Sequence, residues 1–267
     1  MTLRDRLLSH PSFRLEKNMF YQKELSHKNP FEEKYIELRK REQRVYSDDV
    51  VRNLPEFNED VSLKEEWAIR KNTLKKLIKY LEKKNEKLLI LELGCGNGWL
   101  SHNLAKSLTA EILGVDVNEA ELLQGATIFK NYQNLSFLYA DIFSADLKNE
   151  TFDVILLASS IQYFPDLSQL VNRLLELTKP SGEIHFADTP IYSSREESQQ
   201  AQKRSRDYFV SQGVPEMISK YFHHHYDELR SFNHRILFDP NSLISILKRR
   251  ILRSPQPVFP WVLIKQR

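Results

Sequence analysis

The stretch that decides the fold is LLILELGCGNG, residues 88–98, an apolar run that ends in three closely spaced glycines. The apolar residues 88–93 predict a β-strand, and the residues after the glycines, 99–108, predict a helix. The 267 residues contain only seven glycines, so almost half of them lie in this one loop. A glycine-rich turn between a strand and a helix is where a doubly wound α/β sheet binds a nucleotide-like ligand.

Four further segments after this loop predict strands, residues 111–117, 135–142, 152–159 and 183–189, and the predicted helices include residues 118–129 and 167–178. Strands separated by helices indicate βαβ units and a parallel sheet. The run VILLA, residues 154–158, suits a strand buried on both faces. Two later segments, residues 235–238 and 259–267, bring the expected number of strands to seven, the last of them antiparallel. We therefore predict an α/β fold with a doubly wound, mostly parallel sheet.

The segments outside this alternation predict a cover for the sheet. Residues 1–61 are expected to form a helical extension, with loop and short helix over 1–30 and an amphipathic helix over 31–46. Ser62 and Glu65 have the spacing of a capping box, which opens a long helix and the main domain, residues 62–267. Residues 190–226 are polar and basic and contain a break at 213–215, so we expect a lid insertion after the fifth strand. Short helices are expected over 227–232 and 241–251.

Composition excludes several classes of protein. Cys95 is the only cysteine, which excludes an intrachain disulfide and a multi-cysteine zinc site. No apolar run approaches the roughly 18 residues of a membrane-spanning helix, and residues 1–10 lack the apolar core of a signal peptide. The default expectation is a cytoplasmic protein with no membrane partner. The net charge is +5 over residues 1–87, −8 over 88–190 and +6 over 191–267.

Two carboxylates follow the glycine loop at the expected ends of the next strands, Asp116 and Asp141. A carboxylate roughly 20 residues beyond such a loop can accept hydrogen bonds from ribose hydroxyls, and one on the neighbouring strand can accept from a purine amine. With Glu92, these groups disfavour a pyrophosphate, which needs positive potential. They favour a neutral or cationic ligand that carries ribose and adenine. The alternative for each is structural: close packing for the glycines, and helix or turn capping for the two aspartates.

The motifs E-L-G-C-G-N-G at 92–98, V-D-V at 115–117, A-D-I at 140–142 and F-D-V-I-L-L-A-S-S at 152–160 resemble the class I S-adenosylmethionine-dependent methyltransferases. The resemblance covers about residues 60–189 and implies a Rossmann-like methyltransferase fold with S-adenosyl-L-methionine as cofactor. It places the methionine part against the glycine loop, the ribose on the second strand and the adenine on the third. The implied cofactor-binding residues are Glu92, Gly94, Cys95, Gly96, Gly98, Asp116, Val117, Asp141, Ile142, Ala158, Ser159 and, for the carboxylate, Arg39 or Arg70.

The resemblance also narrows the acceptor. No cysteine follows the fourth strand, as a 5-methylcytosine enzyme requires, and residues 159–165 (SSIQYFP) depart from the motif of adenine-N6 enzymes. A glutamate pair typical of protein-arginine enzymes is missing there, and Asp188 alone qualifies as an acidic ligand of a catechol-type metal site. What remains is a small-molecule acceptor methylated on an O, N or C atom.

Methyl transfer from a sulfonium is an in-line displacement, so positioning of donor and acceptor can supply most of the catalysis and a general base is optional. The candidate catalytic residues are Asp188 and Tyr163, near the expected methyl-transfer point, and His223 in the lid. The run 223–225 of three histidines resembles a metal site, but adjacent histidines rarely bind one ion, and no metal is expected.

Three alternatives stay open. The basic flanks would suit a methyltransferase of RNA or protein, although the densest basic run, Lys248-Arg249-Arg250 with Arg253, is small, and we expect no nucleic-acid partner. A methyltransferase-like module could also bind the cofactor without turnover. A nicotinamide dehydrogenase is weakened because Trp99 stands where the dinucleotide motif has its third glycine.

Overall fold

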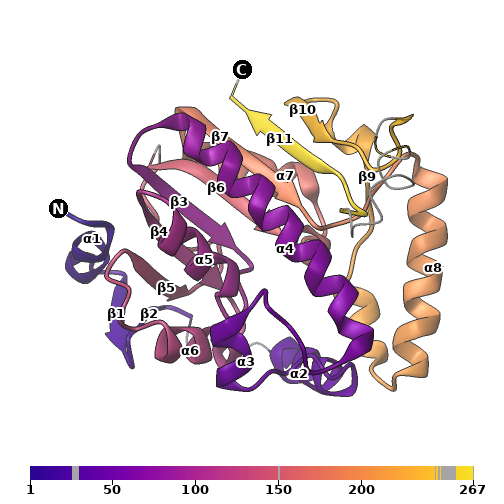
Figure 1. The fold of residues 1–267 in the computed structure, drawn as a ribbon, viewed down its shortest axis with the longest axis horizontal. Helices are drawn as coiled ribbons and strands as arrows, with labels where there is room; N and C mark the ends of the chain where they lie inside the picture. Colours follow the sequence, from indigo (N-terminus) through magenta and orange to yellow (C-terminus); the bar gives the residue numbers. More distant parts are fainter. Residues whose placement is uncertain (26–29, 150, 244, 246, 248–256, 267) are drawn as a thin grey trace.

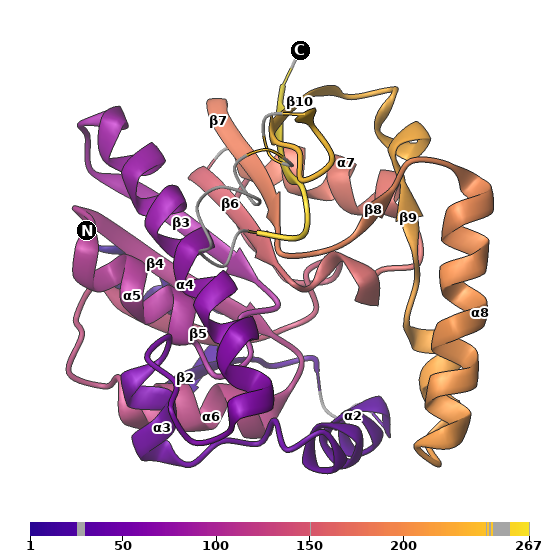
Figure 2. The same ribbon diagram turned by 45° about the vertical axis from the view of Figure 1, so that its right-hand side comes forward.

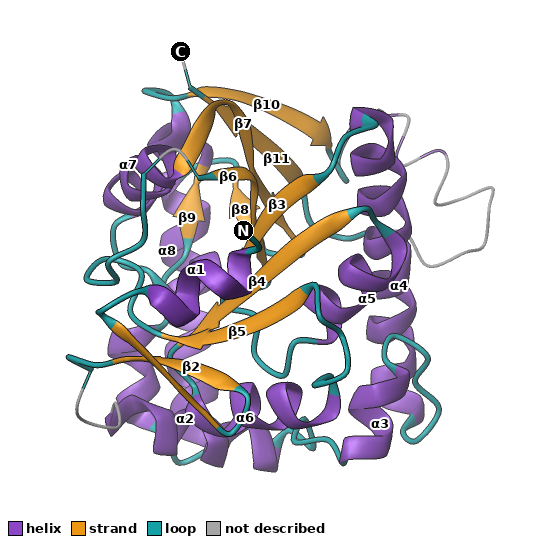
Figure 3. Cartoon of the chain, turned by 90° about the vertical axis from the view of Figure 1, so that its left-hand side faces the viewer, coloured by secondary structure: helices purple, strands orange, loops and turns teal. Residues whose placement is uncertain are grey.

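A computed structural model describes residues 1–25, 30–149, 151–243, 245, 247 and 257–266 (Figure 1). A sheet with the strand order β1-β2-β5-β4-β3-β6-β7-β11-β10 runs through the molecule, and helices cover both of its faces (Figure 3). Its strands are β1 Phe13–Glu16, β2 Met19–Gln22, β3 Leu88–Leu93, β4 Ala110–Asp116, β5 Leu135–Tyr139, β6 Phe152–Ala158, β7 Thr178–Ala187, β10 Asn233–Phe238 and β11 Trp261–Lys265. The helices are α1 Leu3–Ser9, α2 Pro30–Arg41, α3 Asp48–Asn53, α4 Val61–Leu81, α5 Trp99–Ser107, α6 Glu119–Ile128, α7 Leu167–Leu177 and α8 Arg195–Ser211.

The pairing confirms the doubly wound, mostly parallel sheet. Strands β2, β5, β4, β3, β6 and β7 are mutually parallel along this order, whereas β11 runs antiparallel to both β7 and β10. Because β3 lies between β4 and β6, the chain reverses its winding direction at the carboxyl end of β3. That reversal opens a crevice at the glycine loop.

The expected strand count of seven is wrong, since the sheet described here has nine strands. All seven predicted strands are present, and the two additional ones, β1 and β2, form a hairpin in the segment expected to be loop and short helix. Each has only four residues, and their turn consists of Lys17 and Asn18, both with positive φ, rather than the Asn-Gly that signals a tight hairpin. Although short, β2 is buried along its whole length beside β5.

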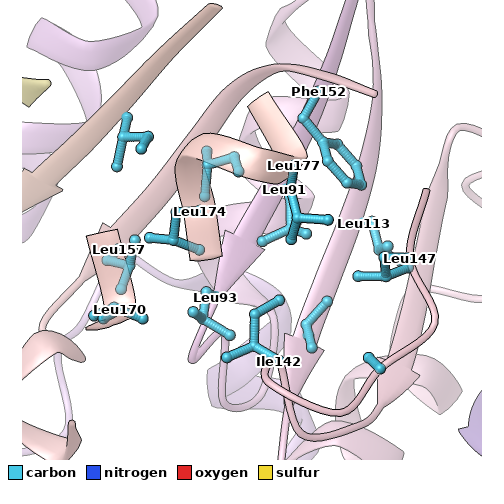
Figure 4. Packing of buried hydrophobic residues seen from close by; sticks show 14 of the residues in the cluster. Leu91, Leu93, Leu113, Ile142, Leu147, Phe152, Leu157, Leu170, Leu174 and Leu177 are labelled. Atoms are coloured by element: carbon cyan, nitrogen blue, oxygen red, sulfur yellow. The ribbon is translucent and has the colours of Figure 1, made fainter. Parts of the chain in front are cut away.

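Alternate residues of the central strands build one apolar core on each face of the sheet. Leu91, Leu93 and Leu113 pack toward α7, as Figure 4 shows with Leu170, Leu174 and Leu177. Their neighbours Ile90 and Ile112 point to the other face, against α4 and α5. Side chains that leave water on both faces explain why these strands read as continuous apolar runs.

The helices differ from the sequence predictions mainly at their ends. The helix expected over 31–46 is α2, which ends at Arg41, and the short α3, capped by Ser47, was missed. The long helix α4 begins at Val61, so Ser62 lies inside the helix and the capping box expected at Ser62 and Glu65 is wrong. Helix α6 begins after Asn118, whose side chain accepts from the Glu121 amide. The helix expected over 227–232 is a 3-10 turn, η4 Tyr226–Leu229. Residues 248–251 of the helix expected over 241–251, and the basic run 248–253, lie outside the described residues.

The segment 190–226 contains the short strands β8 Ile191–Tyr192 and β9 His224–His225, the helix α8 and the 3-10 turn η3 Pro215–Lys220. In Figures 1 and 2, α8 stands apart from the sheet, with α2 beside its lower end. Leu38 of α2 packs there against Phe209, Val214 and Met217. Helix α2 and the segment 190–226 therefore share a small core of their own.

No helix in the described part of the chain combines the length and apolarity needed to cross a lipid bilayer.

Candidate functional site

The glycine loop leaves β3 with a left-handed backbone at each glycine: φ is +75° at Gly94, +52° at Gly96 and +73° at Gly98. A Cβ on Gly94 would lie 2.4 Å from the Cβ of Ser160, and a Cβ on Gly98 would lie 2.4 Å from the ring of Phe137. These two glycines therefore allow close packing of the loop against neighbouring elements. Around Gly96 there is more room, since the nearest atom is the Glu121 Oε2 at 3.2 Å.

Two cavities meet at this loop. The first, of about 650 Å³, lies between the glycine loop, α2, α4 and the segment with α8 and η3. The second, of about 530 Å³, lies at the carboxyl ends of β4 and β5. The residues that line both cavities are Tyr35, Gly94, Gly96, Glu121, Ser159 and Tyr163. The cavities are thus two adjoining halves of one crevice.

The structure brings most of the predicted site residues to this crevice. The second cavity receives Asp116, Val117, Asp141 and Ile142, and the first receives Arg39, Arg70, Glu92, Cys95, Ala158 and Asp188. Gly98 and His223 are not among the residues that line either cavity. For Gly98, the packing against Phe137 is the role that the geometry supports.

Asp116 lies at the end of β4, and its carboxylate orders the loop beside it. The Gly96 amide donates to Oδ2 at 2.7 Å, and the Asn118 amide donates to Oδ1 at 2.8 Å. Burial raises the pKa of Asp116, and the amide donors oppose that rise. Each carboxylate oxygen can accept a second hydrogen bond, so these contacts leave room for a ligand hydroxyl in the second cavity.

Asp141 also caps its own turn, as the structural alternative proposed. Its Oδ1 accepts from the Phe143 amide at 3.2 Å, and its Oδ2 accepts from the Ser144 hydroxyl at 3.1 Å. Beside it, Val117, Ile142 and Phe143 give the second cavity apolar walls. A flat apolar ring with one donor group would match this combination.

Glu92 lies below the glycine loop, and the Ser101 hydroxyl donates to its Oε2 at 2.5 Å. Burial raises the pKa of Glu92 to about 8. The carboxyl group therefore holds its proton near neutral pH until a cationic group enters the first cavity.

Glu121 is a lining residue that the sequence analysis missed. It lies in the first turn of α6 and faces Gly96, and burial raises its pKa to about 7, against the opposing charge of Arg39. The sequence did contain a signal for Glu121, because Asn118 marks the start of α6 and Glu121 lies in the first turn after it. What the sequence lacked was the position of α2, which places Arg39 on the opposite wall.

At the ends of β6 and β7, two non-glycine residues have a left-handed backbone, Ser159 with φ +57° and Asp188 with φ +52°. The Ser159 hydroxyl donates to the Asp188 carbonyl at 2.8 Å, and the Thr73 hydroxyl of α4 donates to Asp188 Oδ1 at 2.7 Å. Burial raises the pKa of Asp188. Strained backbone of this kind is concentrated at functional sites, and here it turns a carboxyl group into the first cavity.

Three tyrosines from different segments meet where the cavities join. Tyr163 lies edge-on to Tyr35 of α2, with ring centroids 5.8 Å apart, and edge-on to Tyr221 after η3, at 5.7 Å. Burial raises the pKa of Tyr163 to about 12, so its hydroxyl stays protonated at physiological pH. The predicted candidate Tyr163 thus belongs to an aromatic contact between the two covering segments and the sheet.

The three histidines do not share one set of contacts: His224 and His225 approach Glu228, whereas His223 contacts Ser205. His223 Nε2 is 2.9 Å from the Ser205 hydroxyl, and burial lowers its pKa to about 4. His224 lies between the Glu228 carboxylate and the carbonyls of residues 161 and 164. Within the described residues, no group of three or more side chains has the arrangement of a metal site.

Comparison with known proteins identifies the family to which the chain belongs. The model of a methyltransferase domain family matches residues 82–229. Among the curated relatives, the sterol 24-C-methyltransferase of Candida albicans is 22% identical over 140 residues, 51% of this chain and 37% of the relative. The phosphoethanolamine N-methyltransferase of Triticum aestivum is 32% identical over 109 residues, 39% of this chain and 21% of the relative. The aligned part of this chain thus spans well under half the length of either relative.

Among solved structures, the magnesium protoporphyrin IX methyltransferase of Synechocystis PCC 6803, determined with bound S-adenosylhomocysteine, is similar with a TM-score of 0.54. The alignment covers 85% of this chain and 94% of that chain at 15% sequence identity. At this identity the similarity establishes a shared fold.

Proposed function

Since this chain belongs to the methyltransferase domain family, whose model matches residues 82–229, we propose that it transfers a methyl group to an O, N or C atom of a small-molecule acceptor. The cofactor is S-adenosyl-L-methionine. The observation that carries the proposal is the crevice of two adjoining cavities around Gly96, with Asp116 and Asp141 in one half.

The residues present fit this cofactor. The second cavity combines the Asp116 carboxylate for the ribose hydroxyls with Asp141 and an apolar wall for the adenine. At the glycine loop, Gly96 leaves space that a side chain would narrow, and Glu92 and Glu121 offer carboxylates to a cationic ligand. The Nε of Arg39 is buried with no hydrogen-bond partner in the structure. It can therefore donate a hydrogen bond to the carboxylate of the cofactor.

The acceptor occupies the first cavity, beside the ends of β6 and β7. When bound, S-adenosyl-L-methionine supplies an activated methyl group, so the chain mainly has to orient the acceptor and exclude water. Asp188, held by Thr73, is placed to accept a hydrogen bond from the acceptor. Tyr163 borders both cavities and is placed to keep the acceptor in line with the donor methyl. Each of these roles is part of the proposal.

The names of the relatives support a small molecule as acceptor. One methylates a sterol and one phosphoethanolamine, according to their names. For the present chain we propose an acceptor of the same general class, a small molecule, but neither of these two substrates in particular. We also propose that no nucleic acid or membrane partner is needed.

The segments over the crevice act as its cover. The segment 190–226, with α8 and η3, closes the first cavity together with α2. A bound cofactor and acceptor should slow tryptic cleavage after Arg204 and Arg206, whereas equal cleavage rates with and without ligands would argue against a lid.

The direct test combines two measurements on the purified chain. Mass spectrometry of co-purifying small molecules should detect S-adenosylmethionine or S-adenosylhomocysteine, and calorimetry should show saturable binding of S-adenosylhomocysteine. NADH is the matched competitor because it shares the adenosine group. Tighter binding of NADH than of S-adenosylhomocysteine would refute the proposed function.

A further inference from the structure

Three arginines line one wall of the first cavity: Arg39 on α2, Arg44 in the loop after it, and Arg70 on α4. Their side chains are 20%, 23% and 21% exposed. Guanidinium groups that are so far withdrawn from solvent need partners, and a cavity wall that gathers three of them is suited to planar anionic groups.

The carboxylates that contact this wall are fewer than the arginines. Glu66 accepts from Arg44 at 2.6 and 2.5 Å and from Arg70 at 2.8 and 3.1 Å. Although burial alone would raise the pKa of Glu66, the hydrogen bonds from Arg44 and the charge of Arg70 lower it to about 2. Glu66 is therefore fully ionised and shared by two guanidinium groups.

Glu42 is the second carboxylate of the wall. Its contact with Arg39 is long, at 3.5 Å, and it also accepts from the Tyr208 hydroxyl at 2.6 Å. Arg44 approaches it only to 3.6 Å. Two carboxylates thus face three guanidinium groups, which leaves one positive charge on this wall.

Among the described residues, the other carboxyl groups of the cavity make no hydrogen bond to these arginines; Glu92 accepts from Ser101 and Asp188 from Thr73. Glu65 is exposed, where solvent screens it. Burial raises the pKa of Glu92 to about 8 and that of Glu121 to about 7, which favours their uncharged forms. Burial also raises the pKa of Asp188. Glu92 lies on β3, Glu121 on α6 and Asp188 after β7, so none of the three belongs to the helices that carry Arg39 and Arg70.

The wall runs from the cofactor half of the crevice to the acceptor half. At one end, the charge of Arg39 acts on Glu121, which faces the glycine loop. At the other end, the charge of Arg70 acts on Asp188, at the end of β7. Arg70 is held in place there, since its guanidinium lies 5.1 Å from the ring centre of Trp67, whose indole donates to Tyr46.

From this placement we propose that Arg70, with Arg44, binds an anionic group of the acceptor, a carboxylate or a phosphate. The inference rests on the proposed function and names the class of its substrate. Arg39, at the glycine-loop end, faces Glu42 and is the partner for the carboxylate of the cofactor. Arg44 and Arg70 share the single carboxylate of Glu66, so the positive charge left over lies at the acceptor end of the wall. An acceptor anchored by its anionic end at Arg70 would present its nucleophilic atom beside Asp188.

The test uses the whole chain saturated with S-adenosylhomocysteine. Inorganic phosphate and benzoate are titrated at constant ionic strength and followed by calorimetry and thermal shift, with neutral benzamide as the uncharged counterpart. We expect saturable binding of phosphate or benzoate but not of benzamide. Arg70→Gln should weaken that binding about 10-fold or more, the loss typical of a hydrogen bond between charged groups, while the affinity for S-adenosylhomocysteine changes less than about 3-fold.

Two further variants sharpen the result. Glu66→Gln should strengthen anion binding, because it releases both arginines from their carboxylate. Arg52→Gln is the matched control, since Arg52 is 53% exposed on α3 and pairs with Asp49 far from the wall's arginines. It should leave anion binding unchanged.

Two outcomes would overturn the inference. One is no anion binding to the loaded wild type. The other is anion binding only to the cofactor-free chain, together with a 10-fold loss of S-adenosylhomocysteine affinity in Arg70→Gln, which would assign the wall to the cofactor carboxylate. If the wild type bound no S-adenosylhomocysteine at all, the proposed function would fail, and the titration of the free chain would still decide whether Arg70 binds anions.

Discussion

At the scale of single residues, Asp116 orders the backbone beside it and also lines the second cavity, so its substitution tests its part in cofactor binding. Its Oδ2 orders the glycine loop through the Gly96 amide, and its Oδ1 accepts from the Asn118 amide at the start of α6. A hydrogen bond to a charged group contributes about 1.5–3 kcal/mol, so Asp116→Ala should weaken S-adenosylhomocysteine binding about 10- to 100-fold. Calorimetry measures the change, with Asp49→Ala, at a 91% exposed side chain, as the control. Unchanged affinity in a folded Asp116→Ala chain would remove this assignment.

Glu92 makes stability depend on pH in a defined direction. Its pKa is raised from 4.5 to about 8 in the folded chain, so between these values the folded state holds a proton that the unfolded state has lost. The free energy of unfolding should therefore fall as pH rises from 5 to 8, with a slope of at most about 1.4 kcal/mol per pH unit from this group.

Urea denaturation at several pH values measures this slope, and Glu92→Gln should flatten it. The comparison isolates Glu92 from Glu121, because Glu121 is unchanged in both chains. Identical pH dependence of the wild type and Glu92→Gln would show that Glu92 is already ionised in the folded state.

At the scale of elements, the glycine loop separates packing from binding. Gly98→Ala forces a left-handed backbone, at about 1–2 kcal/mol, and places a Cβ 2.4 Å from the Phe137 ring. Gly96→Ala has a similar backbone cost, but its Cβ points toward Glu121 in the crevice. We expect Gly98→Ala to lower the melting temperature by about 2–4 °C for each kcal/mol lost, and Gly96→Ala to lower S-adenosylhomocysteine affinity more than Gly98→Ala does. The reverse order would contradict the division of roles.

At the scale of the whole molecule, the N-terminal hairpin extends the sheet beyond the part that the family model matches. Met19 and Phe20 of β2 are fully buried, and Tyr21 donates to Glu119 at 3.0 Å. Removing residues 1–24 would uncover the edge of β5 and lose several buried apolar side chains, Met19 and Phe20 among them, at about 1.5–3 kcal/mol each. We expect a fall in melting temperature of about 5 °C or more, measured by calorimetry against the full chain. A truncated chain as stable as the full one would show that the hairpin adds nothing to the sheet.

The sequence by itself determined the elements whose signals are local. Apolar runs of strand length separated by helical segments indicated the parallel sheet. Gly94, Gly96 and Gly98 marked the turn after β3, and Asp116 and Asp141 followed at strand ends. The position of these residues could be predicted because parallel strands end at one edge of a sheet, so a residue's place along its own strand already decides whether it reaches the crevice.

Only the tertiary structure decided which side chains from distant segments meet. The arginine wall depends on how α2 and α4 are placed beside the glycine loop, because these segments bring Arg39, Arg44 and Arg70 together. Glu121 reaches the crevice because the first turn of α6 faces Gly96. His223, plausible by its chemistry, faces Ser205 instead. Strand β2 joins the sheet by pairing with β5, and β1 pairs with β2. None of these placements has a local signature, because helix crossings and edge-strand pairing follow from packing between segments that are far apart along the chain.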